Sequence, residues 1–169
     1  MNDVLIGIHS SGPHSNGYSL IRKILEINEI DLSESFDGST LGEKLLCPTR
    51  IYVDLIKELK DELQINAIAH ITGGGLIENL PRVIPNHLKA NIELANWKQP
   101  AIFSWLQDKG NINSFEMYKT FNCGIGMVIS VGQNDAEKAI DILNEKQANA
   151  SLIGYLSERS TTEAIQLIE

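Results

Sequence analysis

Short apolar runs and helical apolar stripes alternate along this chain of 169 residues. The runs over 4–8 (VLIGI) and 123–131 (CGIGMVISV) are rich in β-branched residues, so they predict buried strands, and the longer run predicts a central one. Apolar side chains recur at helical spacing over 20–27, 51–63 and 136–143, which predicts helices that pack by one face.

Weaker patterns predict the remaining elements: strands over 66–72, 90–94, 151–156 and 164–168, and helices over 76–83, 100–108 and around 115–118. The strand over 90–94 alternates apolar and polar residues, so we expect it to be half-exposed. A polar turn separates the last two strands, and we therefore expect them to pair as an antiparallel hairpin.

Turn and capping residues set the expected boundaries. Pro48 is expected to open the helix that follows it, because the missing N–H costs nothing in a first turn. Asn113 and Asn134 each precede a glutamate by three residues and are expected to cap helices. The acidic, turn-rich stretch 28–44 predicts an exposed excursion.

The order of these elements favours the α/β class (α+β type), with a mixed β-sheet covered by helices. The length fits a single domain spanning residues 1–169. A chain of this length buries enough surface to fold without disulfides or a structural metal.

Charge and composition exclude several classes of protein. The 14 basic and 22 acidic residues give a net charge of −8, which argues against a nucleic-acid-binding surface. The apolar runs are too short for a membrane span, and the first residues lack the features of a secretion signal. Two cysteines outside any C-x-x-C motif suit a reducing compartment, so we expect a cytoplasmic protein.

The loop after the first strand (SSGPHSNG, residues 10–17) is the most informative feature. Gly12 and Gly17 have the spacing of a phosphate-binding P-loop, but Tyr18 stands where that loop needs lysine. An ATP-hydrolysing P-loop is therefore excluded. A glycine loop that leads into a helix N-terminus still suits an anion, although it could simply cap the helix.

A second glycine loop, 73–75, follows the strand over 66–72. Consecutive glycines destabilise regular structure, and they make sense where backbone must approach a ligand or another segment closely. The alternative is a flexible turn. In open α/β sheets, ligands bind at the carboxyl ends of strands, which is where both loops fall.

Single residues of other types favour structural roles. His70 lies in an apolar strand, which favours a core histidine over a catalytic one. Arg50 and Arg82 could bind phosphate, but pairing with surface carboxylates is commoner. The four histidines lack metal-ligand spacing, so no metal site is expected. Cys123 begins an apolar strand, which favours a small buried side chain over a nucleophile.

Four ordered segments resemble one enzyme family. They are 4–23 (VLIGIHSSGPHSNGYSLIRK), 46–52 (LCPTRIY), 68–83 (IAHITGGGLIENLPRV) and 116–127 (EMYKTFNCGIGM). Together they resemble aminoimidazole ribonucleotide (AIR) synthetase, also called phosphoribosylformylglycinamidine cyclo-ligase, of purine biosynthesis. The resemblance covers only the family's C-terminal domain, so it implies that the family's N-terminal domain is absent from this chain.

The resemblance implies that both glycine loops face an interdomain cleft. The substrate- and phosphate-binding residues it implies are Ser11, Gly12, His14, Ser15, Asn16, Gly17, Thr72, Gly73, Gly74, Gly75, Asn79 and Arg82, with Asn122 and Gly124 as further members. It also raises His70 to a candidate catalytic residue without assigning it a role.

The family reaction uses ATP and Mg²⁺ to phosphorylate the formyl oxygen of formylglycinamidine ribonucleotide, after which the amidine nitrogen closes the imidazole ring. The implied partners are the N-terminal domain, a phosphorylated small molecule and, in the full-length enzyme, a second subunit of a homodimer. On its own the chain is expected to be inactive and to bind no cofactor tightly.

Two other functions stay open. The chain could hold a phosphorylated ligand as a domain of a relative, such as formylglycinamidine ribonucleotide synthetase, selenophosphate synthetase, thiamine monophosphate kinase or a hydrogenase maturation protein. It could also be a structural domain whose glycine loops serve packing between domains.

Overall fold

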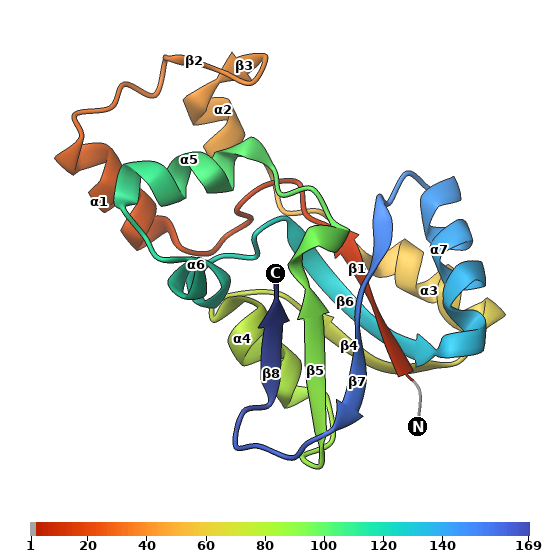
Figure 1. Ribbon diagram of the computed structural model, residues 1–169. Helices are drawn as coiled ribbons and strands as arrows, with labels where there is room; N and C mark the ends of the chain where they lie inside the picture. The colour runs from red at the N-terminus through yellow and green to blue at the C-terminus, as the bar shows by residue number, and fades with distance from the viewer. Residues whose placement is uncertain (1–2) are drawn as a thin grey trace.

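A computed structural model describes residues 3–169 as a six-stranded mixed sheet with helices on both faces (Figure 1). The strands of this sheet are β1 (Asp3–His9), β4 (Ile65–His70), β5 (Leu88–Glu93), β6 (Ile125–Gly132), β7 (Ala150–Glu158) and β8 (Ile165–Ile168). Their order across the sheet is β4-β6-β1-β7-β5-β8. The expected fold class, a mixed sheet covered by helices, is confirmed.

All neighbouring strands pair antiparallel except β5 and β8, which run parallel, with Ala90 opposite Ile165. The expected hairpin between the last two strands is therefore wrong. β5 lies between β7 and β8, and the polar turn carries the chain past β5 to the edge of the sheet. β5 is also more buried than expected, since Ala90, Asn91 and Ile92 are all covered.

The longer helices are α1 (Tyr18–Ile27), α3 (Val53–Glu62), α5 (Ala101–Gly110), α6 (Ser114–Thr120) and α7 (Ala136–Glu145). Shorter ones are α2 (Leu41–Leu45), α4 (Gly75–Asn79) and the 3-10 turns η1 (Leu80–Arg82), η2 (Leu94–Asn96) and η3 (Gln133–Asp135). None of the helices between residues 3 and 169 combines the length and apolar character needed to cross a membrane.

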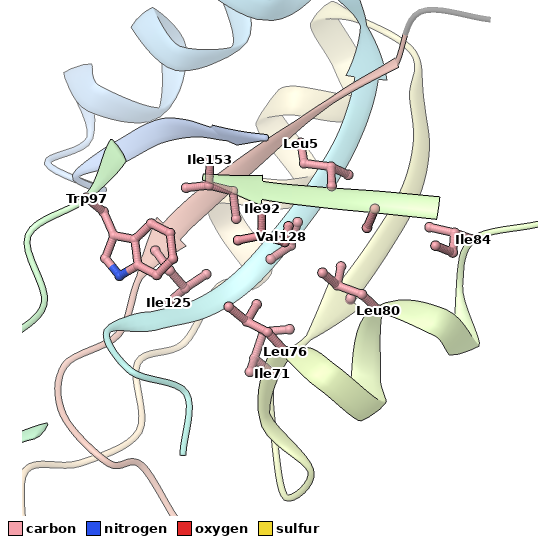
Figure 2. Packing of buried hydrophobic residues seen from close by; sticks show 12 residues of the cluster. Leu5, Ile71, Leu76, Leu80, Ile84, Ile92, Trp97, Ile125, Val128 and Ile153 are labelled. Carbon is pink, nitrogen blue, oxygen red and sulfur yellow. The ribbon is translucent and has the colours of Figure 1, made fainter. Parts of the chain in front are cut away.

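Two apolar layers sandwich the sheet. On one face, Leu76 of α4 and Leu80 of η1 pack against Ile92, Val128 and other strand residues (Figure 2). On the other face, Leu59 of α3 and Leu143 of α7 pack against the opposite side chains of β1 and β6 (Figure 1). β6 is buried on both faces, as its unbroken apolar run predicts.

A third apolar cluster joins α1, α2, α5 and α6 beyond one end of the sheet (Figure 1). The stretch 28–44 is not simply an exposed excursion. It contains the two-stranded ribbon β2 (Ser35–Phe36) and β3 (Ser39–Thr40), and the start of α2, whose Leu41 is buried in this cluster. Thr40 and Glu43 form a reciprocal capping box at α2, a signal that the acidic composition concealed.

Local geometry corrects two further boundaries. The helix expected after Pro48 begins at Val53, because the segment 47–50 runs alongside the first glycine loop instead. Asn134 does not cap α7: it lies within η3, and Asp135 precedes the helix without a side-chain capping bond. Asn113 does cap α6, since its side chain accepts the Glu116 N–H at 2.9 Å.

Candidate functional site

The two glycine loops lie at the same end of the sheet. β1 and β4 both pair antiparallel with β6, so they run parallel to each other and their carboxyl ends coincide. The start of β6 reaches the same end, where Ser10 donates its N–H to the carbonyl of Gly124 at 2.9 Å. Asn16 and Gly73 meet across the loops, and a Cβ on Gly73 would lie 3.6 Å from the Asn16 Oδ1.

Asn122 holds the first loop to the start of β6. Its Oδ1 accepts from the Ser10 hydroxyl and from the Gly124 N–H, both at 2.9 Å, and its Nδ2 donates to the Gly12 carbonyl at 2.9 Å. The residue is 1% exposed. Asn122 therefore positions the loop through buried bonds, with its side-chain oxygen and nitrogen both engaged.

The segment before α3 forms the other side of this loop. The Ser11 hydroxyl donates to the Pro48 carbonyl at 2.6 Å, and the hydroxyls of Ser15 and Thr49 are 3.2 Å apart. Sequence reasoning missed Pro48 and Thr49 as part of the site. The signal was present, because both lie in the LCPTRIY segment that carries part of the family resemblance.

Gly17 opens the N-terminus of α1. It adopts the left-handed conformation at φ 78° and provides no side-chain cap. A Cβ at this position would overlap the ring of Phe121, so only glycine fits. Among residues 3–169, no acceptor bonds the N–H groups of Tyr18 and Ser19, as is usual in a first helical turn, so both remain available at the positive end of the helix dipole. This arrangement suits an anion.

His14 lies inside the first loop, 3% exposed and with a left-handed φ of 58°. Its Nε2 accepts the backbone N–H of Ser11 at 3.1 Å and that of Arg50 at 3.5 Å, which requires an unprotonated Nε2. Burial, with smaller contributions from His70 and Arg50, lowers the pKa of His14 to about 4. Its Nδ1 is buried and has no partner among the described residues.

Asn79 shapes the second glycine loop. Its buried amide donates to the carbonyls of Gly75 at 2.7 Å and Gly73 at 3.2 Å, and its oxygen accepts from the Thr72 hydroxyl at 3.2 Å. Gly74 and Gly75 are both left-handed, at φ 97° and 55°. The Asn79 side chain thus holds the turn, and it affects a bound ligand by fixing the position of the loop backbone.

Arg82 and Arg50 differ in their surroundings. Arg82 is exposed and lies 3.9 Å from the Glu78 carboxylate, as expected for a surface arginine. Arg50 is tied to carbonyls instead: it donates to Ala148 and Gln147 at 3.0 Å each and to His9 at 3.4 Å. It therefore joins the end of β1 to the start of β7.

His70 is exposed, not a core histidine, because β4 is the edge strand of the sheet. Its ring lies 5.9 Å from that of Tyr52, which in turn lies 6.2 Å from His14. Tyr52 is buried, which raises the pKa of its phenol, and its hydroxyl donates to the His9 carbonyl at 3.0 Å. The three rings form a column from the first loop to the open edge of β4.

A groove of about 700 Å³ begins at His70 and Tyr52 and continues along α3. Its volume is in the range of small-molecule sites. Cys123, in contrast, is fully buried at the start of the strand segment, and burial raises its thiol pKa to about 12, which makes it an unreactive packing residue. Within residues 3–169, no cluster of three or more His, Cys, Asp or Glu side chains could hold a metal ion.

The fold is similar to that of several solved proteins. E. coli HypE, a hydrogenase maturation protein, matches with a TM-score of 0.62 at 19% identity, over 98% of this chain and 46% of that one. Thiamine-monophosphate kinase from Stenotrophomonas maltophilia K279a matches with a TM-score of 0.63 at 14% identity, over 98% of this chain and 49% of that one. The chain thus spans about half the length of these proteins.

Two related structures hold nucleotides: HypE in complex with ATP, and a ThiL protein complexed with AMPPCP and TMP. They match with TM-scores of 0.62 and 0.56 at 13% and 14% identity, over 98% of this chain and 47% of each of theirs. At sequence level, the model of the AIR synthase related protein, C-terminal domain, matches residues 2–166. With the fold and the ordered motifs in agreement, the chain belongs to the AIR synthase related protein C-terminal domain family.

Proposed function

We propose that this domain is the ligand-side half of an ATP-using enzyme of its family, and that its two glycine loops hold the phosphate group of a small-molecule substrate. The observation that carries the proposal is the meeting of both loops at one end of the sheet, beside the uncapped N-terminus of α1. Backbone N–H groups and a helix dipole bind phosphate without lysines, which suits a chain of net charge −8.

The residues divide into those that face the ligand and those that hold the loops. Asn16 and Gly73 lie where the loops meet, and Ser15 precedes Asn16 beside Thr49. In this proposal the three residues contact the phosphate. Asn79, Asn122 and Gly124 hold the loop backbone in place. Ser11, Gly12, His14, Gly17, Thr72, Gly74 and Gly75 complete the loop walls, and Arg82 contributes positive charge at the rim.

His70 is the candidate catalytic residue. It is exposed, and its ring ends the column that runs from the first loop through Tyr52 to the groove. An imidazole at that place positions the reacting part of a substrate whose phosphate rests on the loops. The pH dependence of turnover by the complete enzyme distinguishes the roles of general acid, general base and hydrogen-bond donor for this residue.

Two substrate types compete. The structural similarity to thiamine-monophosphate kinase and HypE favours a relative of these enzymes over AIR synthetase itself. The cyclo-ligase that makes aminoimidazole ribonucleotide is the second candidate, and the sequence segments GPHSNGYS and AHITGGG favour it. Thiamine monophosphate and formylglycinamidine ribonucleotide are both phosphate esters, so a kinase of the first type and the cyclo-ligase both fit the proposed role of the loops.

ATP and Mg²⁺ require residues beyond these loops. Residues 10–17 and 72–75 contain no carboxylate to ligate Mg²⁺ and no lysine or arginine to balance a triphosphate. We propose that a second domain, equivalent to the other half of the similar structures, supplies these groups, and that the complete enzyme is a cytoplasmic homodimer. In that enzyme, the present domain binds and orients the substrate.

An NMR titration of the ¹⁵N-labelled chain tests the loop site. The probes are inorganic phosphate, thiamine monophosphate and formylglycinamidine ribonucleotide. We expect saturable shifts in the amides of 11–17 and 72–75, with a tighter fit for one of the two esters. The variant that tests the loop junction is Gly73→Ala, because a Cβ there meets only Asn16 at 3.6 Å. That methyl group leaves the fold intact but narrows the place where the loops meet.

The variant should weaken ester binding about tenfold while the spectrum elsewhere stays unchanged. Shifts confined to residues remote from both loops would refute the phosphate site. Equal ester binding by the wild type and Gly73→Ala would mean that the ligand does not bind where the two loops meet.

A further inference from the structure

The outer edge of the sheet at β4 is open. Ile71 donates its N–H to the Gly126 carbonyl of β6. Backbone groups alternate along an antiparallel strand, so the N–H and C=O of Ile68 and His70 point away from β6, toward the open edge. These groups form a ladder on which a further strand could add.

A groove runs beside this edge, between β4 and α3. Its lining includes the side chains of Ile68 and His70 from the strand and those of Ile56, Lys57 and Lys60 from the helix. At the end near His70, Ile51 and Val53 are 80% and 68% exposed, unusually high values for two neighbouring aliphatic residues. The groove therefore has an apolar end and, one helical turn further along α3, a basic one.

The positive charge of this groove contrasts with the acidic chain. Arg50, Lys57 and Lys60 line it, against a single carboxylate, Asp61. Of the other acidic residues of α3, Glu58 pairs with Lys146 and Glu62 with Lys138, both on the α7 side, and Asp54 is exposed outside the groove lining. Within residues 3–169, no ion pair engages Lys57 or Lys60.

We propose that this edge is a docking site for an extended peptide segment of another protein, which adds to β4 as a strand and directs acidic side chains toward α3. Two acidic residues at alternate positions of a strand lie about 6.6 Å apart, and the rise between Lys57 and Lys60 on α3 is about 4.5 Å, a difference that the long lysine side chains span. Apolar residues further along the same face of the peptide cover Ile51 and Val53.

The backbone and the charge favour a peptide over a small ligand. A small anion would use the lysines but leave the outward backbone groups of β4 unpaired, whereas a strand pairs with both. The groove shares Arg50, Tyr52 and His70 with the surroundings of the first loop, but none of residues 10–17 or 72–75 lines it. The proposal therefore stands apart from phosphate binding by the glycine loops.

Fluorescence anisotropy with the intact chain tests the proposal. The probe is a labelled, blocked nonapeptide, Thr-Glu-Thr-Glu-Thr-Val-Thr-Val-Thr, together with its reversed sequence, since the direction of the added strand is open. We expect one of the two to bind saturably at low salt and more weakly at high salt. The double variant Lys57→Gln/Lys60→Gln should weaken binding about five- to tenfold.

Two controls separate docking from general attraction. Lys23→Gln/Lys109→Gln removes the same charge from exposed sites on α1 and α5 and should leave binding unchanged. Two further peptides carry N-methyl groups on either the odd or the even residues and keep their charges. The peptide whose methyl groups replace the N–H groups that face β4 cannot pair with the edge, and it should bind about tenfold more weakly than the other.

Three results would overturn the proposal. They are the absence of binding by either peptide up to millimolar concentration, equal binding to both lysine double variants, and equal binding of both N-methylated peptides. Self-association of the chain through β4 that excludes the peptide would also refute it, in favour of a second copy as the occupant.

Discussion

The buried ring of His14 makes stability depend on pH. Its pKa in the folded chain is about 4, against 6.5 for an unperturbed histidine, so the unfolded state binds the proton more readily. The stabilising effect is therefore complete above pH 6.5 and is lost as the pH falls toward 4, by about 2 to 3 kcal/mol. Urea unfolding at pH 7, 5.5 and 4.5 measures it.

The matched variant is His14→Gln, whose side-chain oxygen can still accept the Ser11 and Arg50 N–H groups but does not titrate. Carboxylates contribute the same pH dependence to both proteins. The difference between the two stability curves thus isolates His14, and parallel curves from pH 7 to 4.5 would contradict a depressed pKa in the folded state.

Neighbouring glycines of the second loop should respond differently to alanine. At Gly75, φ is +55° and a Cβ would overlap the Tyr118 carbonyl, so Gly75→Ala should cost about 3 kcal/mol of stability. At Gly73 the space is open, and Gly73→Ala should change stability by less than about 0.5 kcal/mol. Thermal denaturation of both variants checks this, and similar losses would mean that the loop is not held as described.

Sequence reasoning at this scale identified the loops but not the roles of single residues in them. Gly12 to Gly17 were recognisable from their spacing, whereas the burial of His14 was not, since a histidine in a polar loop is normally exposed. His70 was misjudged for the converse reason: an apolar strand predicts burial, but β4 ends the sheet. Burial depends on which strand lies next, and that is a long-range property.

At the scale of elements, Arg50 connects segments that are distant in sequence. Its guanidinium donates to carbonyls at the end of β1 and before β7, and its own backbone precedes α3. Arg50→Lys keeps the charge but loses the planar, multiple donation, so we expect a loss of about 1–3 kcal/mol in the free energy of unfolding.

The control for this change is Arg22→Lys on α1, where the arginine is exposed and makes no side-chain hydrogen bond or ion pair within residues 3–169. It should be neutral within about 0.5 kcal/mol. Hydrogen exchange adds a local test, because amides at residues 147–150 should exchange faster in Arg50→Lys. Unchanged amide exchange at residues 147–150 would mean that Arg50 acts by its charge and that its hydrogen bonds do not hold this segment.

The elements themselves were mostly predictable, but their pairing was not. Apolar periodicity located each strand of the six-stranded sheet to within a few residues, because burial on one or both faces imposes the pattern locally, but it missed the short ribbon of β2 and β3. The hairpin expected between the last two strands was wrong because proximity in sequence was the only guide to pairing, whereas β8 pairs with β5 and packs Ile165 and Leu167 against the core. α2 was hidden for a related reason: only two of its residues are buried.

At the scale of the whole molecule, the proposed function makes this chain one half of an ATP-using enzyme, and it predicts what that half does alone. The proposed site has backbone donors and buried amides that hold them, and we expect these to bind a phosphate ester. It has no carboxylate or cation in either glycine loop with which to position Mg²⁺ and a transferring phosphoryl group. Binding and catalysis should therefore separate in this chain.

We accordingly expect the isolated chain to bind its phosphate ester but to form no ADP from ATP in its presence, as measured by ³¹P NMR or a coupled ADP assay. Addition in trans of the other half, taken from a full-length relative, should restore turnover, and His70→Ala should abolish that turnover without weakening ester binding more than about threefold. Turnover by the chain alone would show that this domain already holds the complete catalytic machinery, and would move the search for the Mg²⁺ ligands to carboxylates outside the loops, beginning with Glu78 beside Gly74.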